Sequence, residues 1–255
     1  MKMKNLVFTD LQRALLSWRF LLCIFGFTGI MLAAVSGFYS HASSVWYLLY
    51  FSITGSGTAS LILCVIPILP FAVKFATEWE DSAVSFWIIR TGVTRYTLSK
   101  IIVSAVSGFL TIAGSIVLFI LVLRLWYPLF SKSITSDIYN TLMEQGYVIK
   151  GLLSFTIHVG LSGVLTAVCA MWVSTYLPNR FVVVAAPIVL HFTLLRLTNR
   201  LELPGYLKPI NWVEGIYYTA SPVGTLMIKL TTVLVVCTIL CIAATLQMKR
   251  RISHA

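Results

Sequence analysis

Charged side chains are scarce in this sequence of 255 residues, and acids are scarcer than bases. Charged residues make up 11% of the chain and hydrophobic residues 58%, with eight acids against nineteen bases. A soluble domain usually carries about 25% charged residues, so there are too few charges here to cover a water-soluble surface. This shortage excludes an ordinary soluble protein and indicates that lipid surrounds most of the chain.

Several functional motifs are also missing. The sequence contains no G-x-x-x-x-G-K-[ST] phosphate loop and no H-E-x-x-H helix, the patterns typical of a nucleotide-binding site and of a zinc protease. No arginine-rich run with interleaved aromatics occurs, so we expect no nucleic-acid partner. The five cysteines lie inside apolar runs, where we expect free thiols that act as small hydrophobic side chains.

Six apolar stretches are long enough, or nearly so, to cross a bilayer, which takes about 20 residues. They run over residues 18–38, 45–71, 101–123, 151–177, 181–197 and 225–248. The fifth is short and contains Pro187 and His191, so a kinked span and a re-entrant segment both remain open. The predicted fold is an all-α polytopic membrane protein, with one transmembrane domain over residues 1–255.

The basic residues predict the orientation, because loops on the cytoplasmic side retain Lys and Arg. With an inner N-terminus, twelve bases fall inside: Lys2, Lys4, Arg13, Arg19, Lys74, Arg90, Arg95, Lys100, Arg180, Lys249, Arg250 and Arg251. Seven fall outside: Arg124, Lys132, Lys150, Arg196, Arg200, Lys208 and Lys229. We therefore expect both termini in the cytoplasm. We attribute the net charge of +11 to this topology and to the attraction of basic residues to anionic lipid.

Residues 1–17 have the pattern of an interfacial helix. The run Thr9-Asp-Leu-Gln12 fits a capping box, which predicts a helix start at Thr9. Leu11, Leu15 and Trp18 recur at helical spacing while Asp10 faces elsewhere, so the helix should lie along the membrane surface. The alternative is a simple extension of the first span.

Residues 75–100, between the second and third spans, are too charged to cross a membrane and too patterned to be disordered. Thr77 and Glu80 fit a second capping box, and Gly92 suits a helix end. Trp79, Ala83 and Phe86 form an apolar stripe, and acidic residues form a second stripe. The two stripes indicate a helix whose two faces contact different surroundings. A connector on the headgroups and a docking helix both fit, and the acids favour docking on a basic groove.

The chain resembles the type-2 permeases of ABC transporters over nearly its whole length. The resemblance rests on the acidic run Glu78-Trp-Glu80-Asp81-Ser82 and on Arg90-Thr-Gly92-Val-Thr-Arg95-Tyr96-Thr-Leu-Ser99-Lys100. The turn Leu177-Pro-Asn-Arg180 and the stretch Tyr206-Leu-Lys-Pro209 also fit. Two departures are Ser82, where the family usually has Gly, and the lack of a Pro before Arg95.

The resemblance implies six transmembrane helices, with an N-terminal interfacial helix and a cytoplasmic coupling helix between spans two and three, in a bacterial plasma membrane. It implies a partner ATPase subunit that binds ATP and Mg, because this chain binds no cofactor of its own, and a second copy or a related permease to complete the pathway. The implied docking residues are Glu78, Trp79, Glu80, Asp81, Arg90 and Arg95. Membrane lipids are the other expected partners.

Inside the membrane, two kinds of residue could serve a pathway or packing. His158 and His191 could ligate a haem or relay protons, or could bond neighbouring hydroxyls. The small residues of span two (Thr54, Gly55, Gly57 and Thr58) and of span four (Gly160, Ser162, Gly163 and Thr166) fit close packing and also a lining on which helices slide. No catalytic or metal site emerges from either set.

The outer segment 198–224, with Trp212, Tyr217 and Tyr218, is predicted to be a re-entrant or interfacial lid. The predicted function is export of an amphipathic peptide, antibiotic or lipid-like molecule. A membrane enzyme (a haem oxidoreductase or an intramembrane protease) and a non-transporting immunity or scaffold protein remain alternatives.

Overall fold

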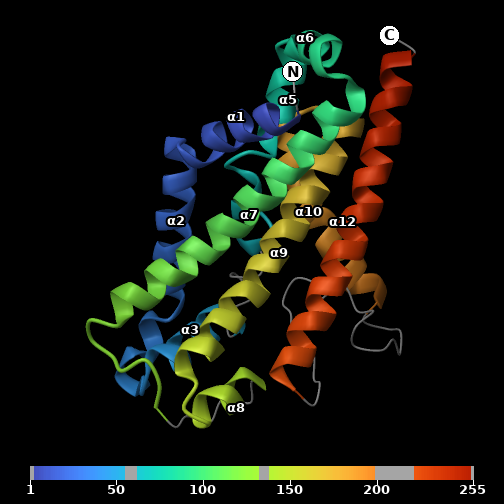
Figure 1. Ribbon diagram of the computed structural model, residues 1–255. Coiled ribbons are helices and arrows are strands. Elements are labelled where there is room, and N and C mark those ends of the chain that lie inside the picture. The colour runs from blue at the N-terminus through green and yellow to red at the C-terminus, as the bar shows by residue number, and fades with distance from the viewer. Residues whose placement is uncertain (1–2, 55–61, 132–137, 199–220, 254–255) are drawn as a thin grey trace.

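The computed structural model describes residues 3–54, 62–131, 138–198 and 221–253 (Figure 1), and these are helical or in short connections, with no strand among them. The helices that pack into the bundle are α1 (Met3–Leu15), α2 (Trp18–Ala34), α3 (Val45–Thr54), α5 (Val73–Glu80), α6 (Ala83–Thr91), α7 (Val93–Leu123), α8 (Ile138–Glu144), α9 (Val148–Tyr176), α10 (Arg180–Thr198) and α12 (Pro222–Ser253). Two 3-10 turns, η1 (Ser36–His41) and η2 (Ile66–Ile68), complete the described elements.

Four of these helices are long and apolar enough to cross a membrane: α7, α9, α10 and α12. The bent pair α1 and α2 brings the number to as many as five within the described part of the chain. The predicted all-helical, multi-span character is therefore confirmed. The predicted second span, residues 45–71, is described only in part: α3 covers Val45–Thr54, residues 62–63 are helical, and residues 64–71 form turns and η2.

Helix α9 is the centre of the bundle. It packs against α7, α12, α10 and α8, and 72% of its most apolar window is buried, against 11% for α12. Its closest neighbour is α7: a Cβ built at Gly108 would lie 2.6 Å from the carbonyl oxygen of Gly163. Only glycine permits two backbones to approach this closely, so the close-packing interpretation of Gly163 is confirmed.

Helix α1 is a separate helix, but it begins earlier than the predicted capping box. It starts by Met3, six residues before Thr9, and joins α2 at a bend of 50°. Ser17 makes the break, because its hydroxyl donates to the carbonyl of Ala14 and accepts from the N–H of Phe20 as the cap of α2. Asp10, predicted on the polar face, is instead 2% exposed.

The segment between α3 and α7 forms two short helices rather than one. Helix α5 ends at Glu80, so the predicted start at Thr77 is wrong; the Thr77 hydroxyl donates back to the carbonyl of Val73 within α5. Ser82 turns the chain with a positive φ of 57°, and α6 follows. The predicted stop at Gly92 is confirmed, with φ at 79° and its N–H bonded to the carbonyl of Ile88.

This break divides the predicted apolar stripe. Trp79 is half-buried on α5, whereas Phe86 on α6 is 73% exposed. Figure 1 shows α5 and α6 at one end of the bundle, together with α1 and the C-terminal end of α12, and α8 at the opposite end. The two ends are called the α5 end and the α8 end below.

The turn at Ser82 gives a test of the fold. A left-handed conformation costs an L-residue about 1–2 kcal/mol, and glycine adopts it freely at the cost of greater entropy in the unfolded chain. Ser82→Gly should therefore leave stability unchanged or raise it by up to about 1 kcal/mol. Thermal unfolding in detergent measures the effect.

Ser85→Gly is the matched control, since Ser85 lies exposed inside α6 and glycine there should lower stability by about 0.5–1 kcal/mol. A melting temperature that falls equally in both variants would contradict the left-handed turn.

Candidate functional site

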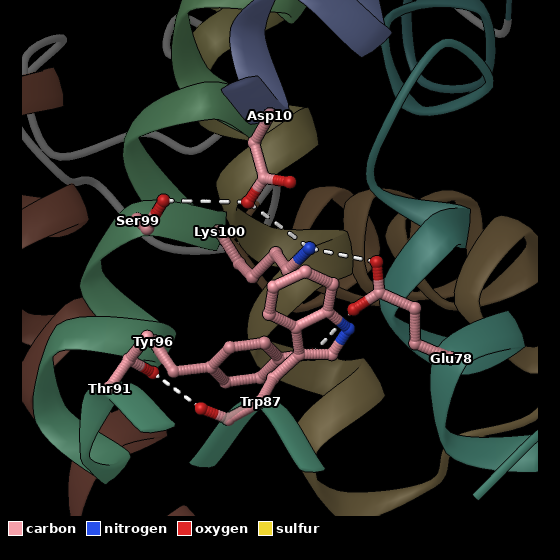
Figure 2. Close-up of polar contacts among 7 residues, drawn as sticks. All are labelled: Asp10, Glu78, Trp87, Thr91, Tyr96, Ser99 and Lys100. Carbon is pink, nitrogen blue, oxygen red and sulfur yellow. Dashed lines mark hydrogen bonds and ion pairs between the residues drawn. The ribbon is translucent and has the colours of Figure 1, made fainter. Parts of the chain in front are cut away.

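A buried ionic cluster lies at the α5 end, centred on Lys100 of α7. The ammonium lies 3.2 Å from Oδ2 of Asp10 and donates to Oε1 of Glu78 at 2.9 Å. The Tyr96 hydroxyl donates to the other oxygen of Glu78 at 2.6 Å, and the Ser99 hydroxyl donates to Asp10 at 3.5 Å. Figure 2 shows these five residues, which we call the Lys100 cluster, converging from α1, α5 and α7.

The cluster is almost closed to solvent. The side chains of Lys100 and Asp10 are 3% and 4% exposed, and that of Glu78 is 12% exposed. Buried charges are tolerated only when they are paired and hydrogen-bonded, and here one cation faces two carboxylates. Phe71 and Tyr96 add their rings at 5.4 and 5.3 Å from the Lys100 ammonium, within the range of cation–π attraction.

Helical spacing places these side chains. Tyr96, Ser99 and Lys100 are separated by three and four residues along the first turns of α7, so they share one face. On α1, the buried residues Leu6, Asp10 and Ala14 also share one face, and α1 packs against α7. The apolar residues around Tyr96 include Phe75 of α5 and Trp87 of α6.

Three consecutive residues of α5 each meet a cation from a different long helix. Glu78 binds Lys100 of α7; Trp79 lies with its ring centre 4.8 Å from the guanidinium carbon of Arg251 of α12; Glu80 pairs with Arg180 of α10 at 2.6 Å. Helix α5 is therefore held by α7, α12 and α10 at once. We call this set of contacts the α5 anchor.

The two arginines of the anchor are themselves positioned by neighbouring backbone. Arg251 donates to the carbonyl of Tyr176 at the end of α9. Arg180 is the first residue of α10. The N–H groups of Phe181 and Val182 in the first turn donate to the side-chain oxygen of Asn179. Asn179 is therefore an N-cap, which the sequence argument missed. The Arg180–Glu80 pair is 51% and 37% exposed and so adds little stability.

Lys74 of α5 is a second cation beside the cluster. Burial lowers the pKa of the Lys74 ammonium, repulsion from Lys100 lowers it further, and attraction by Glu78 opposes both. The pKa of Lys74 is lowered overall, with burial as the largest cause.

The structure separates the six predicted docking residues into two groups. Glu78 and Trp79 are engaged within the chain, as is Glu80 through Arg180. Asp81, Arg90 and Arg95 are exposed. Sequence reasoning missed Ile89, which is 83% exposed one helical turn after Phe86; the spacing of the two apolar residues was the available signal.

The predicted membrane residues have different surroundings. His158 of α9 is buried, with Nδ1 2.9 Å from the Tyr139 hydroxyl of α8. His191 of α10 lines a cavity whose lining does not include His158, so the two histidines are not brought to one site. The Thr54 hydroxyl donates to the carbonyl of Tyr50, and Gly55, Gly57 and Thr58 lie outside the described residues.

Two other expectations have clear outcomes. The assignment of Lys229 to the outer loops is wrong, because it lies within α12, fully buried, and donates to the Ser162 hydroxyl of α9 at 3.1 Å. The five cysteines form no disulfide, as predicted. Most of the predicted outer segment 198–224, with Trp212, Tyr217 and Tyr218, lies outside the described residues, as does the stretch 206–209.

The α5 end is a network of paired charges and hydrogen bonds. It holds charges in a fixed arrangement, and no group of three or more His, Cys, Asp or Glu side chains in the described residues could hold a metal ion. No protein-family model, curated protein or solved structure matches the chain. The function therefore has to be inferred from this geometry and from the resemblance.

The Lys100 cluster predicts a large effect of removing its cation. Lys100→Met leaves two buried carboxylates without a compensating cation, which should lower stability by about 3–5 kcal/mol. Arg180→Met is the surface control and should cost at most about 1 kcal/mol. Thermal unfolding in detergent measures both.

The triple variant Asp10→Asn, Glu78→Gln, Lys100→Met should be more stable than Lys100→Met alone, because no uncompensated charge remains. If Lys100→Met is no worse than Arg180→Met, the cluster does not stabilise the fold.

Proposed function

We propose that this chain is the membrane-spanning permease subunit of an ATP-driven exporter, with ATP hydrolysed on a separate ATPase subunit. The observation that carries the proposal is the contrast within the inner loop: α5 is anchored to three long helices, while α6 presents an exposed apolar face. A loop that transmits force needs firm contacts with the transmembrane helices and an exposed surface to which the ATPase can bind.

The free surface is formed by Phe86 and Ile89, 73% and 83% exposed, with Asp81 and Arg90 exposed beside them. Figure 1 shows α6 farther out along the bundle than α1. If α1 marks the membrane surface, α6 projects past the headgroups into water. Large apolar side chains gathered in water are typical of a protein-binding site, so α6 is the proposed coupling helix.

The anchor explains how docking would reach the pathway. A push on α6 passes to α5 through their shared apolar packing around Phe75 and Val84. From α5 it passes to α7 through Lys100, to α12 through Arg251 and to α10 through Arg180. Each of these contacts specifically joins one residue of α5 to one residue of a long helix. Small movements of the loop would therefore shift the inner ends of the three long helices together.

The topology fits the permease class. Counting α1 with α2 as one crossing and residues 45–71 as a broken crossing gives six, because α3 lies toward the α8 end and α5 at the other (Figure 1). The distribution of basic residues then favours an α5 end in the cytoplasm, and the resemblance implies a bacterial cell. A second copy or a related permease would complete the pathway for an amphipathic peptide, antibiotic or lipid-like substrate.

The test is co-purification of a soluble ATPase with the tagged protein in mild detergent. Phe86→Glu with Ile89→Glu should reduce the recovered ATPase by about tenfold or more, since hot-spot side chains of this type are each worth about 2 kcal/mol or more. Asp81→Lys should give a smaller loss. Glu78 is left intact, because changing it would also disturb the Lys100 cluster.

Tyr147→Glu is the matched control: Tyr147 is 52% exposed and lies just before α9 at the α8 end, so ATPase recovery should be unchanged. Absence of any ATPase with the wild type would contradict the proposal. If the ATPase binds but ATP-dependent export from cells does not depend on the chain, the scaffold interpretation replaces the exporter.

A further inference from the structure

A cavity of about 210 Å³ lies between α9, α10 and α12. Its floor is α9, and its walls are α10 and α12, both of which pack on α9. The lining residues are Cys64, Leu165, Thr166, Cys169, Trp172, Pro187, Leu190, His191, Leu194, Val236 and Leu240. The cavity is partly open, and Leu194 in its lining is 38% exposed.

The cavity lies at the middle of its walls. Its lining residues on α10 run from Pro187 to Leu194, midway along a helix that spans Arg180–Thr198. Those on α12, Val236 and Leu240, are midway between Pro222 and Ser253. In helices long enough to cross a bilayer, the midpoint is at the depth of the hydrocarbon core. Only 18% and 11% of the most apolar windows of α10 and α12 are buried, so an opening between these outward-facing walls meets acyl chains rather than water.

The lining selects for an apolar occupant. The Thr166 hydroxyl already donates to backbone carbonyls of α9, at 3.2 Å from Ser162 and 3.1 Å from Gly163. Most of the remaining surface is aliphatic, thiol and aromatic, and the other polar groups among the lining residues are the His191 imidazole and the Trp172 indole N–H. An apolar cavity of about 150 Å³ stays dry and binds small hydrocarbons, so this larger, mostly apolar one can hold a segment of an alkyl chain.

The proline in the wall explains why α10 does not close the space. Pro187 lies inside α10 and lines the cavity. It cannot donate a hydrogen bond to the carbonyl four residues earlier, and its ring displaces the helix there. The hydrogen-bond ladder of α10 is therefore incomplete on the wall of the cavity. Tight helix packing would otherwise be expected there.

We propose that this cavity is a binding site for an acyl chain of a membrane lipid, inserted between α10 and α12 from the bilayer. The chain would replace the van der Waals contacts that an empty apolar space forfeits. The proposal does not rest on the exporter function and stands or fails independently of it.

Trp172 in the lining is a natural reporter. The protein is reconstituted in phosphatidylcholine vesicles whose acyl chains carry bromine at mid-chain, and Trp172 emission is taken as the difference between each protein and its Trp172→Phe counterpart. The vesicles contain no other apolar ligand, so quenching reports the lipid. We expect Trp172 of the wild type to be quenched, and Val236→Phe, which fills the cavity, to lose at least half of that quenching.

Val235→Phe is the matched control, because Val235 is the next residue of α12 but is 54% exposed and absent from the lining; its quenching should equal that of the wild type. Equal quenching in Val236→Phe and Val235→Phe would show that Trp172 meets only surrounding lipid and would overturn the proposal, as would no quenching in the wild type.

If Val236→Phe does not fold, Cys169→Phe fills the cavity from α9 and serves the same comparison. Photolabelling of the wild type by a lipid with a diazirine in its acyl chain should mark the α9 peptide containing Cys169 and Trp172. Labelling elsewhere alone would also overturn the proposal.

Discussion

The buried charge of Lys100 is the constraint on which the α5 end depends. An ammonium removed from water needs compensating anions, and the two that it meets come from different parts of the chain: Asp10 from α1 and Glu78 from α5. The three elements can hold their positions only together. Glu78 uses both oxygens, one for Lys100 and one for the Tyr96 hydroxyl, which fixes the orientation of α5 as well as its position.

The same helix carries the remaining contacts of the loop. Trp79 and Glu80 follow Glu78 and meet arginines from α12 and α10, so one helical turn of α5 is shared among three long helices. The left-handed residue Ser82 then separates α5 from α6, and α6 makes its own surface with Phe86 and Ile89. The proposed coupling role of α6 rests on this arrangement of an anchored helix followed by an exposed one.

Within the membrane region, packing is tight on one side of α9 and loose on the other. Toward α7, glycines at 108 and 163 let the two backbones meet, with each Cβ position blocked by the carbonyl of the other helix. Toward α10 and α12, the cavity interrupts the contact, while Lys229 of α12 is fully buried and donates to Ser162 of α9.

The sequence by itself determined the helical, multi-span class, the close approach at Gly163 and the helix end at Gly92, because hydrophobic length and glycine geometry are local properties. The two capping-box patterns did not mark the helix starts, because Thr9 and Thr77 both lie inside helices. Packing against α7 extends α1 upstream of Thr9, and packing of α5 extends that helix upstream of Thr77. The burial of Asp10 and Lys229 and the anchoring of Glu78, Trp79 and Glu80 could not be foreseen. Each depends on a partner that is distant in the chain, from 22 residues between Glu78 and Lys100 to 172 residues between Trp79 and Arg251. Only the tertiary structure brings these partners together, because a charged group can be buried only where another group pairs with it or forms a hydrogen bond to it.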